Sequence, residues 1–273
     1  MLKQRVITAL LLLAVLLPAL FYPSPEPFCA VTLLLIVGGG WEWARLNGFG
    51  PVASWLSGGL LGAVLLGLWW QLGLTTPMPG LWLAAAGLWG LLSVGLLRAG
   101  VAGWPRIPRA LRFGLGWVLI GLAWWAMAQA RHLGVAMLLS MLLLVWMADI
   151  AAYFGGRAFG RRKLAPTISP GKSWAGVYSG ALGVLLLALA WVAVDPAGTS
   201  LYGRLWALGP VPALLALFGL TALSVAGDLI ESLVKRSAGV KDSSGLLPGH
   251  GGVLDRVDAL LPVLPVAMML ATW

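Results

Sequence analysis

The chain has 273 residues, of which 60% are hydrophobic and only 10% are charged, and its mean hydropathy is +0.93. This composition is typical of polytopic membrane proteins and argues against an ordinary soluble domain. The formal net charge is +9, but the basic residues stand in short loops between apolar runs, which argues against nucleic acid as a partner. The single cysteine, Cys29, excludes an intramolecular disulfide and a cysteine-based zinc site.

Apolar runs long enough to cross a hydrocarbon core of about 30 Å recur along the chain, with prolines and glycines between them. We therefore predict an all-α, polytopic integral membrane protein with about nine transmembrane helices. The predicted spans are residues 5–22, 28–46, 52–73, 79–98, 113–131, 134–154, 174–194, 207–236 and 253–273. We expect the first run to be retained as a helix rather than cleaved as a signal peptide. Residues 1–131 would form about five N-terminal helices, and residues 132–273 a catalytic region of about four helices with cytoplasmic loops.

The lysines and arginines predict the orientation of the helices. With a cytoplasmic N-terminus, all of them except Arg131 and Arg204 fall on the inner side, as the positive-inside rule requires. We therefore expect a multi-pass protein of a bacterial-type inner (cell) membrane, with its C-terminus outside. The loop with Arg106, Arg109 and Arg112 would either lie against anionic lipid headgroups or simply determine topology.

The polar stretch between Gly227 and Asp258 is the strongest candidate for a site. It holds most of the nine carboxylates of the chain, namely Asp228, Glu231, Asp242, Asp255 and Asp258. Ionisable groups are costly beside a bilayer, so their clustering indicates a function. Asp228 and Asp255 are predicted to hold Mg²⁺, because one or two carboxylates plus substrate phosphates are its usual ligands. This site would face the cytoplasm.

Each of these residues also has a purely structural interpretation. Glu231 and Lys235 have the spacing of an i,i+4 ion pair, which would only stabilise the helix. Lys235 and Arg236 could anchor that helix at the membrane interface. Asp258 could accept hydrogen bonds from Arg256 or from loop amides.

A second polar stretch runs from Asp149 to Gly176. Its Gly171-Lys172-Ser173 sequence lacks the glycine that a Walker loop requires five positions earlier, because Pro166 stands there. The stretch instead offers basic side chains and hydroxyls that suit a triphosphate or a phospholipid headgroup: Arg157, Arg161, Arg162, Lys163, Lys172, Thr167, Ser169 and Ser173. A loop that is basic only because it is cytoplasmic would explain the arginines, but it would not explain the S-P-G-K-S-W order.

Together these residues resemble the integral-membrane phosphatidate cytidylyltransferases (CDP-diacylglycerol synthases). The family signature S-x-x-K-R, K-D and H-G-G-x-x-D-R-x-D is matched by Ser232, Lys235, Arg236, Lys241, Asp242, His250, Gly251, Gly252, Asp255, Arg256 and Asp258. The elements D-x-x-A-Y-x-x-G and S-P-x-K-[ST]-W-E-G are matched at 149–156 and 169–176, except that Ala175 stands where the family usually has glutamate.

The glutamate of the family motif can be introduced as Ala175→Glu. This variant should raise kcat/KM about tenfold if the carboxylate tunes the site. If the carboxylate only stabilises a helix start, it should add stability alone. We favour the effect on kcat/KM.

The resemblance implies the transfer of CMP from CTP to phosphatidate, which gives CDP-diacylglycerol and pyrophosphate. It implies catalytic roles for Lys241, Asp242, Asp228 and Asp255, and Mg²⁺, with K⁺ as a possible neighbour, at Asp228, Asp255 and Asp258. The implied substrate-binding residues are Ser169, Lys172, Ser232, Lys235, Arg236, His250, Gly251, Gly252 and Arg256. The partners would be CTP, phosphatidate and membrane lipids, with a homodimer as an open option and with no nucleic acid.

Two alternatives remain open. A CTP-dependent lipid kinase would share the membrane, the nucleotide and the metal, but it would transfer the γ-phosphate to a lipid hydroxyl. An ion-coupled transporter could use Asp149, Asp228 and Asp255 as an ion pathway. Transporters usually place such groups at the bilayer midplane between internal repeats, whereas here they gather at one side.

Overall fold

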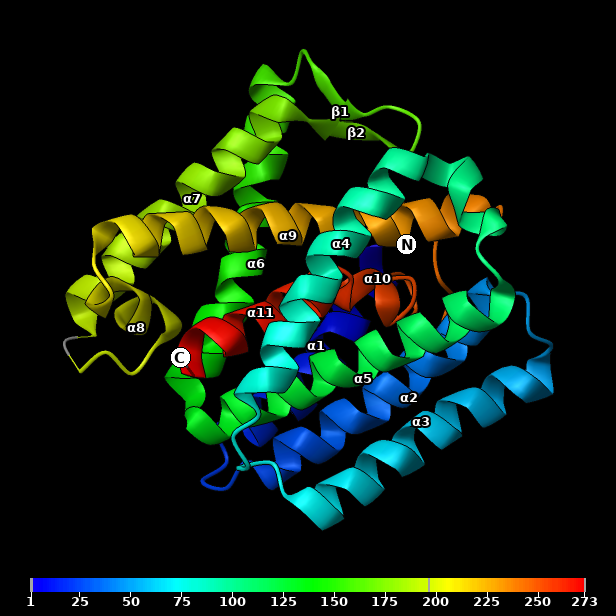
Figure 1. Ribbon diagram of the computed structural model, residues 1–273, viewed down its shortest axis with the longest axis horizontal. Helices are drawn as coiled ribbons and strands as arrows, with labels where there is room; N and C mark the ends of the chain where they lie inside the picture. The colour runs from blue at the N-terminus through cyan, green and yellow to red at the C-terminus, as the bar shows by residue number, and fades with distance from the viewer. Residues whose placement is uncertain (1, 196, 273) are drawn as a thin grey trace.

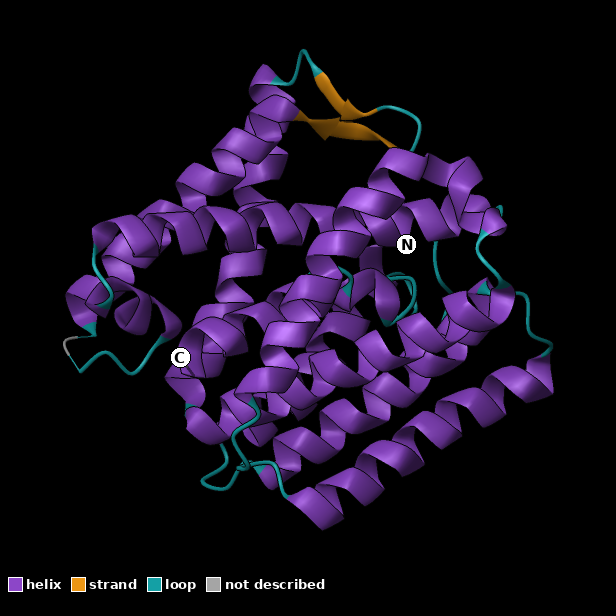
Figure 2. Ribbon diagram, viewed as in Figure 1, coloured by secondary structure: helices purple, strands orange, loops and turns teal. Residues whose placement is uncertain are grey.

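The computed structural model describes residues 2–195 and 197–272, and they form a helical bundle with one small hairpin (Figures 1 and 2). The elements are α1 (Leu2–Phe21), α2 (Glu26–Leu46), α3 (Pro51–Leu72), α4 (Pro79–Gly103), η1 (Trp104–Arg106), α5 (Arg109–Leu133), α6 (Val135–Phe159), β1 (Lys163–Ala165), β2 (Ser169–Ser173), α7 (Trp174–Val194), α8 (Leu201–Ala207), α9 (Pro210–Ser237), α10 (Leu254–Val257) and α11 (Leu260–Thr272). The prediction of an all-α polytopic membrane protein is confirmed, because 8 of the described helices are long and apolar enough to span a membrane.

The ninth predicted span, 253–273, is not confirmed as a continuous helix. It divides into the short α10 and the 13-residue α11, and a helix of that length covers only about 20 Å. α11 is nevertheless mostly buried and packs against α4, α5 and α9. A segment shielded by other helices needs neither the length nor the outward apolar face of a lipid-exposed span.

The packing joins the two halves of the chain. In Figure 1, α2, α3 and α5 run side by side, and α11 lies between this group and α9. α6 and α7 pack closely against each other and carry the β1–β2 hairpin at one end. Because α11 contacts helices on both sides of residue 131, the two regions predicted from the sequence share one bundle. Large apolar side chains point outward, with Trp70 91% exposed, as expected for helices that face lipid.

Small residues allow α6 and α7 to approach each other. A Cβ added at Gly180 would lie 2.9 Å from the carbonyl oxygen of Ala148, and one at Gly183 would lie 2.6 Å from the Cβ of Ala151. Such spacing of small residues is typical of closely packed membrane helices. The contact fixes the stretch of α6 that carries Asp149, directly after Ala148.

Gly227 on α9 packs against the start of α11. A Cβ there would lie 2.6 Å from the carbonyl oxygen of Asp258 and 2.8 Å from Cγ of Pro262. We therefore expect Gly227→Ala to lower the free energy of unfolding by about 1–3 kcal/mol, because the crowded backbone must shift. Unfolding in detergent would measure this. Gly219→Ala on the same helix is the matched control, because no atom lies within 4 Å of its added Cβ. Equal stability of the two variants would contradict this account.

Candidate active site

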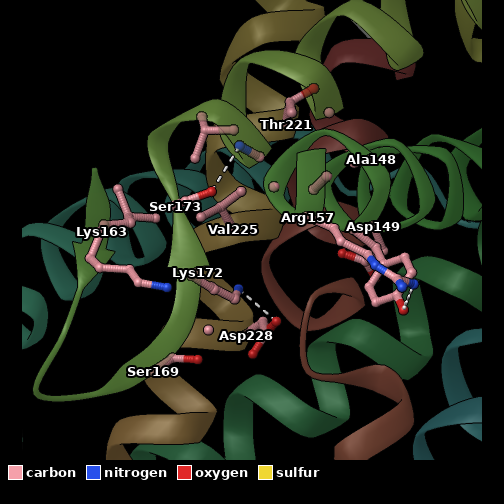
Figure 3. Close-up of a pocket in the computed structure, with 18 residues that line it drawn as sticks. Ala148, Asp149, Arg157, Lys163, Ser169, Lys172, Ser173, Thr221, Val225 and Asp228 are labelled. Atoms are coloured by element: carbon pink, nitrogen blue, oxygen red, sulfur yellow. Dashed lines mark hydrogen bonds and ion pairs between the residues drawn. The ribbon is translucent and has the colours of Figure 1, made fainter. Parts of the chain in front are cut away.

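A cavity of about 610 Å³ lies between α6, α7, α9 and the hairpin (Figure 3). Its polar lining consists of Asp149, Tyr153, Arg157, Lys163, Ser169, Lys172, Ser173, Thr221 and Asp228. The rest of the lining is small or apolar, as at Ala148, Val177 and Val225. Polar groups on an otherwise apolar wall are typical of sites that bind an amphipathic ligand. The cavity joins both polar stretches singled out in the sequence.

An ion pair crosses this cavity. The Nζ atom of Lys172 lies 2.6 Å from Oδ2 of Asp228, and their side chains are 23% and 31% exposed (Figure 3). Ser232, one turn further along α9, donates a hydrogen bond of 3.3 Å to Oδ1 of Asp228. The ion pair is accessible from the cavity, so both partners can exchange each other for a ligand.

The hairpin places Lys172 over α9. β1 and β2 are antiparallel, and the residue after Lys172 ends β2 and caps α7. This cap is Ser173, whose Oγ accepts a hydrogen bond of 3.2 Å from the amide of Gly176, as N-cap serines do. The predicted loop is therefore an ordered hairpin joined rigidly to a helix. Asp149 lies on the opposite wall, close enough to Asp228 and Lys172 for their charges to interact.

A second group of charges lies beside the cavity, at the C-terminal end of α9. Lys235 forms ion pairs with Glu231 and with Asp255, whose Oδ1 is 2.5 Å from Nζ. Oδ2 of Asp255 accepts hydrogen bonds from the Ser243 amide (2.9 Å), the Ser243 hydroxyl (2.9 Å) and the Gly252 amide (2.8 Å). Burial alone would raise the pKa of Asp255, but these donors outweigh it and hold that pKa below its usual value. The i,i+4 ion pair of Glu231 and Lys235 is thus present in the structure.

Asp258 lies between the two groups. Burial, followed by the charge of Asp228, raises the pKa of Asp258 to about 7. Its Oδ1 accepts a hydrogen bond of 2.7 Å from the amide of Ala259. Two carboxylates that repel each other in this way would be stabilised by a cation.

The arrangement fits Mg²⁺ only if the substrate completes its ligands. Among residues 2–195 and 197–272, no three His, Cys, Asp or Glu side chains gather closely enough to hold a metal. Asp228, Asp255 and Asp258 therefore do not form a three-carboxylate cluster. Asp228 and Asp258 supply two carboxylates, the number that commonly holds Mg²⁺ with phosphates. Both oxygens of Asp255 are already hydrogen-bonded. The metal assignments remain predictions.

The remaining predicted residues lie in or near the connection from α9 to α10, outside the described lining of the cavity. Lys241, Asp242, Arg236 and Arg256 are exposed, and Arg236 donates a hydrogen bond of 3.2 Å to the carbonyl of Val240. The turn from His250 to Gly252 has φ of +83° at Gly251, a conformation that favours glycine. These side chains remain candidates for substrate contacts.

Glu42 on α2 is a residue that the sequence analysis missed. It is fully buried and accepts four hydrogen bonds, three from the connection before α10 and one from the amide of Leu254, the first residue of α10. The sequence does contain a signal for Glu42, because it is an isolated carboxylate in an apolar run, and such a charge requires partners. The sequence did not indicate which residues those partners are.

Ala175 lies in the first turn of α7, where Ser173 and Gly176 line the cavity but Ala175 does not. The position favours a helix-start effect over the expected gain in kcat/KM. We expect Ala175→Glu to add about 0.3–1 kcal/mol of stability, because a carboxylate is favourable at a helix N-terminus, and to leave kcat/KM unchanged. Thermal unfolding and steady-state kinetics would measure both. Ala175→Gln is the uncharged control, and a large rise in kcat/KM for the glutamate variant alone would contradict this expectation.

A membrane bundle whose cavity gathers lysines, hydroxyls and carboxylates suits phosphorylated ligands. The chain matches the cytidylyltransferase family model over residues 3–273. It is 40% identical to a phosphatidate cytidylyltransferase of Pseudomonas aeruginosa, over 97% of this chain and 95% of that protein. It is 38% identical to the Haemophilus influenzae protein of the same name, over 97% and 96%, and 42% identical to one of Brucella suis, over 63% and 62%. The chain therefore belongs to the cytidylyltransferase family.

Proposed function

We propose that this protein transfers CMP from CTP to phosphatidate, which forms CDP-diacylglycerol. An oxygen of the phosphatidate phosphate attacks the α-phosphorus of CTP, and the bond to the β-phosphate breaks to release pyrophosphate. That oxygen already carries negative charge, so the reaction needs alignment and charge neutralisation rather than a strong base. The observation that carries the proposal is the Lys172–Asp228 ion pair in a cavity that combines polar and apolar walls.

The side chains in and beside the cavity form two groups. One group would donate to the phosphate oxygens of the substrates, and the other would hold a cation. Lys163, Ser169 and Lys172 on the hairpin are suited to donate to phosphate oxygens. Asp228 and Asp258, with Asp255 beside them, are the residues that would hold Mg²⁺. When bound, Mg²⁺ would neutralise charge on the phosphates. Lys241, which is exposed, would contact the pyrophosphate that leaves, with Asp242 orienting it.

The position of a radioactive label distinguishes the two enzymatic alternatives. The purified protein would be incubated with phosphatidate in mixed micelles and with CTP labelled at either the α- or the γ-phosphate. We expect label in the lipid only from α-labelled CTP, with pyrophosphate released in equal amount. Label transferred to diacylglycerol from γ-labelled CTP, in a parallel reaction, would indicate a lipid kinase, and no transfer to phosphatidate from α-labelled CTP would contradict the proposed function. Diacylglycerol in place of phosphatidate is the control acceptor.

We also propose that the cavity faces the cytoplasm of a bacterial inner membrane. The distribution of lysines and arginines supports this orientation. Cysteine substitutions at Arg162 and Gly245, both exposed, should be labelled by a membrane-impermeant maleimide only after the cells are opened. The native Cys29 is buried, so its background should be low. Labelling of either position in intact cells would contradict the orientation.

Membrane lipids are proposed to contact the basic end of α2 and α5. Three arginines lie over aromatic rings there: Arg45 is 4.7 Å from the Trp41 ring centroid, and Arg109 is 4.0 Å from that of Phe49. The third, Arg112, lies 5.5 Å from Trp104. Aromatic rings and guanidinium groups together are typical of the level of lipid headgroups.

A further inference from the structure

Glu42 is a charged side chain of the N-terminal helices that reaches the residues of the C-terminal signature. It lies in α2, is fully buried and forms no ion pair with the described basic side chains. Its charge is instead balanced by hydrogen bonds. Oε1 accepts from the Ser244 hydroxyl (2.5 Å) and the Val253 amide (2.9 Å). Oε2 accepts from the Ser243 hydroxyl (3.2 Å) and the Leu254 amide (2.8 Å).

These donors come from the two ends of one segment, residues 243–254, here called the anchored loop. Ser243 and Ser244 begin it, and Val253 and Leu254 end it, so Glu42 holds both ends at one point. The closed loop contains the turn of His250, Gly251 and Gly252. A carboxylate can accept four bonds in this manner because both oxygens carry free lone pairs.

The same loop is held from its other side by Asp255. The Ser243 hydroxyl lies 3.2 Å from Oε2 of Glu42 and 2.9 Å from Oδ2 of Asp255, so its single proton is shared between two carboxylates. Asp255 in turn pairs with Lys235 on α9. A chain of polar contacts thus runs from α2 through the anchored loop to α9.

The packing is tight at Gly252, where the anchored loop passes between Glu42 and Ser243. A Cβ at Gly252 would lie 2.0 Å from the Ser243 hydroxyl and 2.3 Å from Oε1 of Glu42. A side chain at this position would displace the Ser243 hydroxyl or the Glu42 carboxylate, so glycine allows the close contact between them and the loop backbone. Because Asp255 and Asp258 directly follow the anchored loop, any movement of its end changes where both carboxylates stand relative to Asp228.

We propose that Glu42 is a positioning residue for CMP transfer: it contacts no substrate, but holds the anchored loop so that Asp255 stays paired with Lys235 and Asp258 keeps its place beside α9. The inference rests on the proposed function. The amide of glutamine would turn an NH₂ group toward donors, so Glu42→Gln removes two of the four acceptor contacts with almost no change in volume. A displacement of about 1 Å in a reacting site can lower the rate about 10²-fold.

The test combines kinetics with hydrogen exchange in the full-length protein in detergent. For Glu42→Gln we expect kcat to fall by about 10²-fold, with a smaller change in KM for CTP. Amides 243–254 should exchange faster, while those of α9 and α11 keep their protection. Glu26→Gln, the same chemical change at an exposed residue in the first turn of α2, is the matched control and should leave kcat and exchange unchanged. A kcat for Glu42→Gln equal to that of the control would overturn the proposal.

A second variant covers the case in which Glu42→Gln unfolds. Ser244→Ala removes one donor to Glu42 and also the acceptor of the Leu246 amide, and we expect it to lower kcat about tenfold and to loosen the same amides. If Ser244→Ala changes neither, the proposal is wrong whatever the stability of the glutamine variant. If the unmodified protein transfers no CMP, the proposed function fails by itself. The exchange measurements would then still decide whether Glu42 holds the loop.

Discussion

Asp228→Asn should lower CMP transfer by about 10³-fold or more, while the protein stays folded. The substitution removes an anionic ligand at the cavity and the partner of Lys172, so both metal affinity and phosphate alignment should suffer. Asp228 is partly exposed, and an ion pair of this kind contributes little to stability. Turnover with α-labelled CTP and thermal unfolding in detergent would measure the two effects separately.

A double variant tests whether Lys172 and Asp228 contribute to turnover together or independently. If Lys172 and Asp228 serve one step, Lys172→Met and Asp228→Asn together should be little worse than Asp228→Asn alone, because residues that act as a unit are not additive. Asp195→Asn is the control, since this carboxylate caps Thr199 and Ser200 in the connection from α7 to α8. Substantial turnover in Asp228→Asn would contradict the assigned role.

Asp255→Asn should lower the free energy of unfolding by about 3–5 kcal/mol and abolish turnover as well. Its carboxylate pairs with Lys235 and accepts three hydrogen bonds from Ser243 and Gly252. Removing one partner of a buried pair is destabilising, and because Lys235 keeps its ion pair with Glu231, the loss should fall at the lower end of this range. Unfolding by denaturant in detergent, followed by the fluorescence of the 16 tryptophans, would measure it.

The outcome for Asp255 also distinguishes the two roles that this residue could have. A variant that loses turnover but keeps its stability would identify Asp255 as a metal ligand, as the family resemblance implies. A variant that loses both would identify it as the anchor of residues 243–254. Arg256→Gln at the next, exposed position is the stability control and should change the free energy of unfolding by less than about 0.5 kcal/mol.

The class of the protein and most of its helices follow from the sequence alone. Apolar runs in contact with lipid form helices, because a helix satisfies its backbone hydrogen bonds within the segment itself. The predicted boundaries of α9 accordingly lie within three residues of those observed, 210–237. Asp228 was likewise recognisable, because a charge at the end of an apolar run has a cost that requires a function, and Lys172 was recognisable as a phosphate donor in a polar stretch. The ninth span was predicted from hydropathy, which cannot distinguish a buried helix from one facing lipid.

Only the tertiary structure decided which of these charges meet. Lys172 and Asp228 are neighbours because the hairpin folds over α9, and no helical periodicity predicts that contact. Asp255, which was predicted to share Mg²⁺ with Asp228, pairs with Lys235 and accepts a hydrogen bond from Ser243, and the shared metal stays a prediction. Glu42 finds Ser243 at a separation of 201 residues. Local sequence determines the cost of burying a charge, whereas the packing of distant helices determines which donors offset that cost.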